Sequence, residues 1–256
     1  MYLKSSLMRC AALAALLTVA AIPVAAQEPT PAPAPVQVEE DTNDPIEGIN
    51  RGIFWYNNQV DRFFLKPVAK VYRTVVPEFG RNRVRNFLDN LDSPVIFAND
   101  LLQGEFDRGG QTMARFMINT TVGVGGLFDV AEDLGVPQHS EDFGQTLAVW
   151  GVGEGPYLML PFLGPSNPRD LTGRIVDLAF DPLTYVDWEE EDLEWVPYAR
   201  FGLDAVDSRA RAIETLDNLE QTSVDFYAAV RSAYRQRRND EIANGKTQIE
   251  DLPDIQ

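Results

Sequence analysis

Two uncharged stretches limit what this chain can fold into more than any other feature. One lies between Arg115 and Asp129, and the other between Glu154 and Arg169. Both are rich in apolar residues but fall short of the ~20 residues that a helix needs to cross a bilayer. Glycine and proline also interrupt them. We therefore expect these stretches to lie in a core, at a membrane interface or around an apolar passage.

Each stretch carries a cluster of glycines. These are Gly123, Gly125 and Gly126 in the first and Gly151, Gly153 and Gly155 in the second. Glycine permits close packing and a positive φ, so tight helix packing or loop bending is one interpretation. The other is a flexible apolar wall that opens for a ligand, and the sequence leaves both open.

The N-terminus has the pattern of a secretory signal peptide, which we assign to residues 1–26. Lys4 and Arg9 are followed by the apolar run Ala11–Ala26, which ends in small residues suited to a signal peptidase. We expect cleavage after Ala26 and export across a bacterial inner membrane, with an uncleaved anchor as the alternative. The cysteine at position 10 precedes the apolar run, so a lipid anchor on it is not expected.

Residues 27–44 are rich in Pro, Ala and Glu and predict a flexible tether. Residues 45–245 predict one helical domain, and residues 246–256 a disordered acidic tail. The formal net charge of −17 argues against nucleic acid as a partner, because phosphate binding needs clustered Lys and Arg. The basic segments 81–85 and 235–238 are interpreted as solvated helix faces or as contacts with headgroups or a partner.

Helical periodicity dominates the domain, with strand-like alternation only at Tyr157–Leu160. The first helix is predicted to start with Asp44 as its cap and to be interrupted at Lys66-Pro67. Another covers 81–91, restarts at Asp92-Ser93-Pro94 and stops at Gly104. Further helices are expected over about 111–122, from 203, and from Thr222 or Ser223.

Aromatic residues gather in the first of these helices. Phe54-Trp55-Tyr56 and Phe63-Phe64 predict core packing in the ordinary case. Trp and Tyr at the end of an apolar region also suit a membrane interface, which is the second interpretation.

No catalytic or cofactor constellation is visible in the sequence. His139 is the single histidine, which excludes a histidine-rich metal site, and we expect it in a surface loop. Ser166 does not lie in a nucleophile elbow, and the glycines fit neither a dinucleotide nor a P-loop fingerprint. The carboxylates are interpreted as solvated or as helix caps. We therefore predict no enzyme, no metal and no cofactor.

Several longer motifs stand in an order that resembles one known family, the MlaA/VacJ family. The motifs are DPIEGINR from Asp44, LKPVA from Leu65, LQGE from Leu102, RFMINT from Arg115, GGLFDVA from Gly125, FGQTL from Phe143, GVGEGPY from Gly151, LPF from Leu160, RD at Arg169 and IANG from Ile242. Together they cover nearly the whole predicted domain.

The resemblance implies an all-α, ring-like helical domain embedded in one leaflet of the outer membrane, on its periplasmic face. It implies passive intermembrane phospholipid transport that removes mislocalised phospholipid from the outer leaflet and so maintains lipid asymmetry. It also implies trimeric porins and the periplasmic lipid carrier MlaC as partners. Family members are usually lipoproteins, and this sequence departs from that pattern because no lipobox is found.

A lipid path needs apolar surface for acyl chains and a polar side for headgroups. The candidate residues for it are Phe116, Met117, Gly123, Gly125, Gly126, Leu127, Phe128, Gly151, Gly153, Gly155, Leu158 and Leu160. The alternative function is a non-transporting periplasmic lipid-binding or envelope scaffold protein, in which the same residues form a plain core. A lipase ranks third because no nucleophile is visible.

Overall fold

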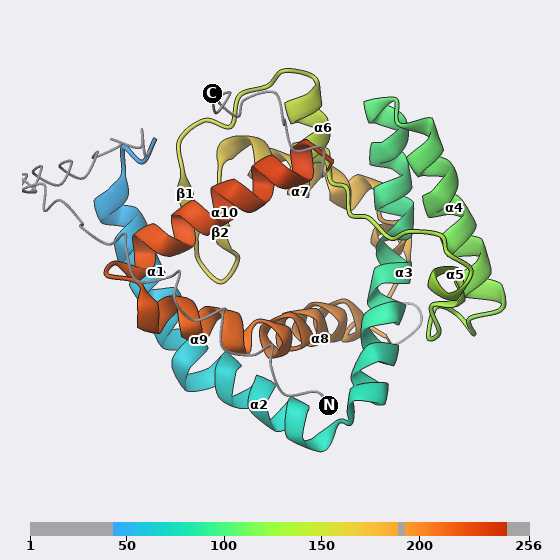
Figure 1. The fold of residues 1–256 in the computed structure, drawn as a ribbon, viewed down its shortest axis with the longest axis horizontal. Coiled ribbons are helices and arrows are strands. Elements are labelled where there is room, and N and C mark those ends of the chain that lie inside the picture. Colours follow the sequence, from blue (N-terminus) through green and yellow to red (C-terminus); the bar gives the residue numbers. More distant parts are fainter. Residues whose placement is uncertain (1–42, 189–192, 245–256) are drawn as a thin grey trace, which may run out of the picture. The chain divides into compact units, whose positions relative to one another are not determined.

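The computed structural model describes residues 43–188 and 193–244, and it is helical through most of them (Figure 1). This confirms the predicted all-α fold. The elements are α1 Glu47–Val60, α2 Lys66–Val75, α3 Glu78–Gln103, α4 Phe106–Thr121, α5 Val130–Asp133, α6 Phe143–Val149, β1 Leu158–Leu160, β2 Gly164–Ser166, α7 Pro168–Phe180, α8 Val196–Arg211, α9 Ile213–Thr222 and α10 Phe226–Ile242. The predicted signal peptide, most of the tether and all of the acidic tail lie outside the described residues.

From Asn43 onward the chain forms one unit. Within it the longer helices follow one another around a ring, with α10 and α7 on one side and α2, α8 and α9 on the other (Figure 1). The main packed pairs are α3 with α4, α6 with α7 and α2 with α8. Among the residues that the structure describes, no helix combines the length and apolarity needed to cross a membrane.

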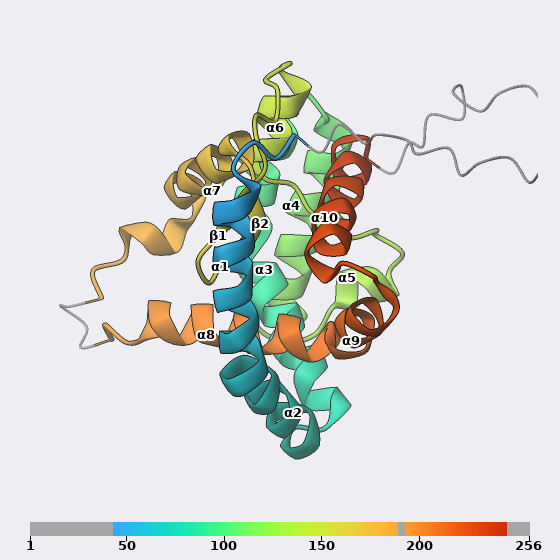
Figure 2. The same ribbon diagram turned by 90° about the vertical axis from the view of Figure 1, so that its left-hand side faces the viewer.

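The predicted break at Lys66-Pro67 is wrong, because α1 and α2 form one continuous helical run (Figure 2). A π-helical turn at Asp61–Leu65 joins them, and the Lys66 N–H donates to the Asp61 carbonyl. Proline lacks an N–H and its ring disturbs a regular α-helical turn. The wider π turn just before Pro67 lets the helix continue across it.

The predicted restart at Asp92-Ser93-Pro94 is also wrong. The helix α3 continues from Glu78 to Gln103 with Pro94 inside it. It packs along α4 and also contacts α6, α7 and α8, so tertiary packing outweighs the local cost of the proline. Its end is as predicted, because Gly104 adopts a left-handed conformation with φ 79°. The helix predicted near 111–122 starts earlier, at Phe106.

Asp44 does not cap α1, contrary to prediction. The helix starts at Glu47 without a side-chain cap. The Asp44 carboxylate instead accepts hydrogen bonds from Asn50 Nδ2 at 2.7 Å, from the Tyr227 hydroxyl and from Arg231 Nη1 at 2.9 Å. It thereby joins the start of α1 to α10.

Helices α8 and α10 also begin at residues other than those predicted. Helix α10 begins at Phe226, later than predicted, because the Asp225 side chain caps it by accepting from the Ala228 N–H. Helix α8 begins at Val196, earlier than predicted.

The buried apolar clusters are small. One joins Ala69, Ala210 and Ile213, and the other joins Tyr157, Met159 and Tyr227. The aromatic residues of the first helical run are mostly outside them: Trp55, Tyr56, Phe63 and Phe64 are all exposed. Core packing is therefore wrong for these four, whereas Phe54 packs edge-on against Phe226 and Tyr227.

Candidate functional site

Buried side chains in this structure are mainly polar or charged, and many large apolar side chains are exposed. Asn99, Asp100 and Thr146 are fully buried, whereas Phe63 is 74% exposed and Tyr198 79% exposed. Burying polar groups is unfavourable unless each is hydrogen-bonded or paired. The interior is therefore stable only if its charged side chains are paired.

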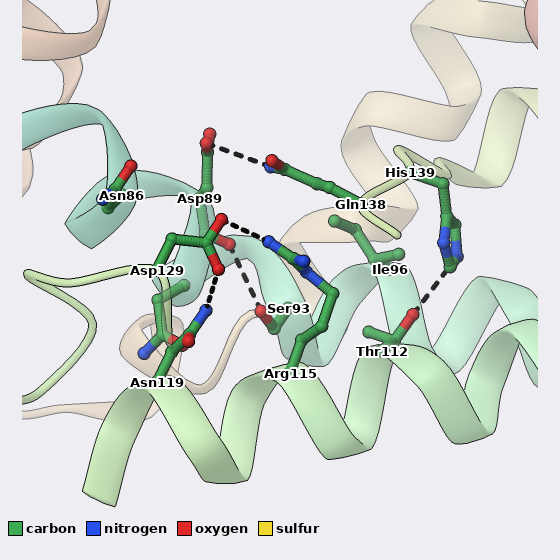
Figure 3. A pocket seen from close by; sticks show the side chains of 11 residues that line it. Asn86, Asp89, Ser93, Ile96, Thr112, Arg115, Asn119, Asp129, Gln138 and His139 are labelled. Carbon is green, nitrogen blue, oxygen red and sulfur yellow. Dashed lines mark hydrogen bonds and ion pairs between the residues drawn. The ribbon is translucent and has the colours of Figure 1, made fainter. Parts of the chain in front are cut away.

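One cluster lies between α3, α4 and the segment after α5, around a cavity of about 30 Å³ (Figure 3). Arg115 on α4 donates to Asp129 at 2.5 Å, and Asn119, one helical turn later, donates to the other oxygen of that carboxylate at 2.9 Å. Burial opposes ionisation of Asp129, but hydrogen bonds from Asn119, the Glu132 N–H and Arg115 together hold its pKa below the usual range.

His139 belongs to the same cluster and is not the exposed loop residue that we predicted. Its Nε2 lies 2.9 Å from Asp100 Oδ1 and 3.2 Å from the Thr112 hydroxyl, which also donates to Asp100 Oδ2 at 2.7 Å. The segment that follows α5 folds back onto α3 and α4 because Asp100, fully buried on α3, needs these partners. The expectation that carboxylates are solvated or caps is wrong for Asp100.

A second charged cluster joins α6, α7 and α10. Arg238 donates to Asp142 at 2.7 Å and to Asp170 at 2.9 Å, and the Tyr234 hydroxyl also donates to Asp170. Burial opposes ionisation of both carboxyls, but the bonds from Arg238 hold the pKa of Asp142 and of Asp170 below the usual range. Arg238 is therefore not part of a solvated helix face.

Asp177 on α7 differs from those carboxylates because only uncharged donors reach it. It accepts from Asn99 Nδ2 at 2.9 Å and from the Phe143 N–H at 3.1 Å. Burial raises the pKa of Asp177 to about 6, and these two bonds offset only part of that effect. Burial likewise raises the pKa of Glu141, although Gln103 and Arg108 donate to it.

Among the described residues, three larger cavities border α7, and two of these are lined by Arg174. We call the first, about 270 Å³ in volume, the α3–α7 cavity, and the second, about 550 Å³, the α9–α10 cavity. The α3–α7 cavity is lined by five carboxylates, Asp89, Asp92, Glu141, Asp177 and Asp181. The α9–α10 cavity is lined by the apolar side chains of Leu163, Leu216, Leu219, Val230 and Ala233 and by the charged side chains of Asp142, Asp170, Arg237, Arg238 and Glu241. Ser140 and Arg174 line both, so the two cavities share part of their walls.

The sequence reasoning missed Arg174 and its neighbours, although a signal was present. Asp170, Arg174, Asp177 and Asp181 recur at spacings of three and four, which places them on one face of α7 and its C-terminal end. Such a charged face is common on solvated helices, and only the contacts of α7 with α3 and α6 turn it toward the interior.

The candidate lipid-path residues lie apart from these two cavities. Met117, Leu127 and Phe128 are exposed near the end of α4, with Phe116 half-buried, and Phe128 packs edge-on against Phe79. Leu158 and Leu160 are half-buried on β1. The candidate residues thus form two separate groups, and their role in a lipid path stays a prediction.

The glycine clusters divide between the two interpretations. A side chain at Gly126 would meet Asn90 at 2.5 Å, and φ there is +91°, so packing and backbone conformation explain this glycine. Gly123 is closed in by the Phe128 and Asn119 carbonyls in the same way. Gly125 and Gly151 face open space but adopt φ values of +70° and +87°, so loop bending explains them, whereas Gly153 faces open space without a positive φ. Gly155 lies against Pro168 at 3.2 Å with a φ of +72°.

Metal-binding geometry is absent from the part of the chain that the structure describes, where no three His, Cys, Asp or Glu side chains gather around a common point. Ser166 is fully buried, and its hydroxyl donates to the Asn167 carbonyl at 3.4 Å, so no base activates it. The arrangement offers paired charges, partly apolar cavity walls and an apolar exterior, which suit binding an amphipathic molecule.

Over most of its length the chain is similar to proteins named for phospholipid transport. The Escherichia coli (strain K12) protein named intermembrane phospholipid transport system lipoprotein MlaA is 38% identical over 212 residues, covering 81% of this chain and 81% of that protein. The Haemophilus influenzae protein of the same name is 36% identical and covers 85% of this chain and 87% of its own length. An uncharacterized protein of Rickettsia bellii is 38% identical over 76% of this chain and 75% of that protein.

The fold leads to the same family. A solved structure, described as the structural basis for maintenance of bacterial outer membrane lipid asymmetry, matches with a TM-score of 0.69 at 36% identity, covering 78% of this chain and 98% of that chain. The family model described as MlaA lipoprotein matches residues 42–241. With this coverage in both sequence and structure, the chain belongs to the MlaA lipoprotein family.

Proposed function

We propose that this protein moves intact phospholipid between membranes of the bacterial envelope, removing mislocalised phospholipid from the outer leaflet of the outer membrane and passing it to a periplasmic carrier. The names of the MlaA relatives and the lipid-asymmetry context of the matching structure support this proposal. Trimeric porins and the carrier MlaC enter as proposed partners through the resemblance alone.

One observation carries the proposal: the distribution of polarity is inverted relative to an ordinary water-soluble domain. Charged and amide side chains fill the interior, while aromatic and aliphatic side chains such as Trp55, Phe64 and Phe201 are exposed. Large contiguous apolar surface on a folded protein marks a site of contact with membrane or partner. At ~25 cal/mol per Å², a few hundred Å² of this surface contributes several kcal/mol of membrane binding.

Transport in this proposal is passive. The described residues present no activated nucleophile, so we assign binding and shielding to this chain and assign direction to the downstream acceptor. Acyl chains need an apolar wall and headgroups need a polar one, and the two cavities that meet at Arg174 provide both.

The test uses the full purified chain with phospholipid vesicles and a soluble lipid carrier. Transfer of intact labelled phospholipid to the carrier is expected to depend on this protein, with no fatty acid or lysolipid released. Hydrolysis products formed in proportion to protein would replace transport with an enzymatic function. A protein that purifies without detergent and binds lipid but never transfers it would instead be a scaffold or storage protein.

The attachment of the protein is a separate proposal. We propose a mature chain that begins at Gln27 with an unmodified N-terminus, held on the periplasmic face of the outer membrane by its own apolar exterior. The relatives are named lipoproteins, so the absence of an anchor stays a prediction. Intact mass spectrometry of the envelope fraction decides it, and an acylated cysteine at the N-terminus would contradict the proposal.

A further inference from the structure

We propose that Arg174 binds the phosphate of the transported phospholipid, with an ammonium headgroup in the α3–α7 cavity and acyl chains in the α9–α10 cavity. The site would then select zwitterionic amine phospholipids, such as phosphatidylethanolamine, over anionic ones. This inference rests on the proposed transport function and names its substrate class.

The Arg174 guanidinium differs from most arginines of the described chain in its ion pairing. Most arginines of the described chain are held by a carboxylate, as Arg115, Arg209 and Arg238 are. Within residues 43–188 and 193–244, Arg174 makes no ion pair with any of the carboxylates around it, and its side chain is exposed. A guanidinium presents donors in a fork that fits two phosphate oxygens, so an unpaired one on a cavity wall is suited to a phosphodiester.

Arg174 lies at the junction of the two cavities. It is one of two residues that line both cavities, and the other, Ser140, carries a hydroxyl that can also donate to phosphate. The phosphate of a phospholipid lies between its headgroup and its acyl chains. A cation at the junction of two cavities is therefore placed where the molecule carries its negative charge.

The α3–α7 cavity carries more carboxylates than cations. Of its five carboxylates, Asp92 and Asp181 share the single cation Arg200, at 2.7 and 2.6 Å. Glu141 pairs with Arg108. Asp89 accepts only from the Gln138 amide at 3.0 Å, and Asp177 only from uncharged N–H donors. The cavity is left with surplus negative charge, which attracts an ammonium and repels an anionic headgroup.

Part of the α9–α10 cavity wall is apolar. Leu216 and Leu219 of α9 and Val230 and Ala233 of α10 form this part, beside a charged part that includes Asp170 and Arg238. The volume of about 550 Å³ is within the range of about 300–1,000 Å³ found for small-molecule sites. Acyl chains shielded here would leave the phosphate beside Arg174 and extend the ammonium toward Asp177 and Asp89.

The experiment measures which lipid the full-length protein retains. The purified chain is incubated with vesicles of equimolar phosphatidylethanolamine and phosphatidylglycerol with matched acyl chains, reisolated, and its bound lipid quantified by mass spectrometry. We expect phosphatidylethanolamine to be enriched about five- to tenfold, as one or two charge-assisted contacts provide. Equal retention of both lipids would overturn the headgroup assignment.

Variants separate the two ends of the site. Arg174→Gln is expected to lower the retention of both lipids about tenfold, and Arg174→Lys to restore part of it. Asp89→Asn, which keeps the shape and the Gln138 contact, is expected to lower the preference about threefold while total retention stays unchanged. The control is Arg73→Gln, which removes a pair with Glu214 and lines neither cavity.

Three further results would contradict the proposal or the function on which it rests. Wild-type retention by Arg174→Gln, or an equal loss in Arg73→Gln, would overturn the role of Arg174. Soluble glycerophosphoethanolamine, which lacks acyl chains, is expected to bind at least about a hundredfold more weakly, and equal binding would identify a soluble phosphodiester as the ligand instead. If the wild-type chain retains no phospholipid at all, the proposed transport function itself fails.

Discussion

Helix α10 buries charged side chains, whereas the α1–α2 run exposes apolar ones. On α10, Arg238 is 8% exposed and lies among carboxylates of α6 and α7. On the α1–α2 run, Phe63 and Phe64 are 74% and 67% exposed and pack into neither buried apolar cluster. The difference indicates that paired charges within the ring stabilise the fold, while the exposed apolar side chains contribute little to it.

The largest expected effect is on the α10 side of this comparison. Arg238→Met leaves Asp142 and Asp170 without their cation, and removing one partner of a buried ion pair costs about 3–5 kcal/mol of unfolding free energy. Chemical denaturation in detergent measures the loss. The neighbouring Arg237→Met is the control, because its side chain is 79% exposed and its pair with Glu241 contributes about 0.5 kcal/mol or less. Equal losses in the two variants would remove the distinction.

The next effect contrasts two phenylalanines of the α1–α2 run. Phe54→Ser removes the edge-on contacts with Phe226 and Tyr227, which lie at 5.3 and 5.5 Å, and is expected to cost about 2–3 kcal/mol of stability. Phe64→Ser is expected to change stability by only about 0.5 kcal/mol.

The same pair of variants separates folding from membrane binding. Phe64→Ser should weaken binding to phospholipid vesicles about tenfold, measured by co-flotation, because it removes apolar area from the exterior. If Phe64→Ser unfolds the protein, or binds vesicles as wild type does, the exterior is not a membrane surface.

The smallest effect concerns a buried carboxylate that lacks a cation. The folded pKa of Asp177 is about 6, against about 4 in an unfolded chain. Between these values the folded state binds more protons than the unfolded state, so the Asp177 contribution to stability falls as the pH rises from 4 to 6. Asp177→Asn cannot lose a proton at this position. Its free energy of unfolding relative to that of the wild type should therefore rise by about 1–2 kcal/mol between pH 4 and pH 7.

Denaturation at the two pH values tests this difference. Asp133→Asn, at an exposed position on α5, is the control and is expected to follow the wild type. A constant difference between Asp177→Asn and the wild type across the range would contradict the assignment of this titration to Asp177.

Local periodicity and turn residues were enough to predict the class of fold and the end of α3. The left-handed Gly104 and the apolar spacing of Tyr227, Val230 and Tyr234 on α10 needed no tertiary information. The proline positions failed, since a π turn before Pro67 and the packing of α3 around Pro94 depend on contacts with other helices. Helix propensity describes the free-energy cost of a proline within a helix, but it does not describe the tertiary contacts that offset this cost.

The candidate site was predicted less well, for a different physical reason. Asp44 accepts a hydrogen bond from Arg231, which lies 187 positions later in the sequence, and Asp142 accepts one from Arg238, 96 positions later. His139 meets Asp100 across 39 positions. A single sequence carries no record of such pairings, and an acidic side chain has the same identity whether it is solvated or buried.

The polar interior has a consequence for how the protein responds to temperature. The heat capacity change of unfolding rises with the apolar surface newly exposed and falls with the polar surface newly exposed. Here much of the apolar surface, including Trp55 and Phe201, is already exposed before unfolding, while groups such as Asn99 and Asp207 become hydrated only on unfolding. The stability curve of the protein is therefore flatter than that of a water-soluble domain of its size, so cooling weakens the fold less.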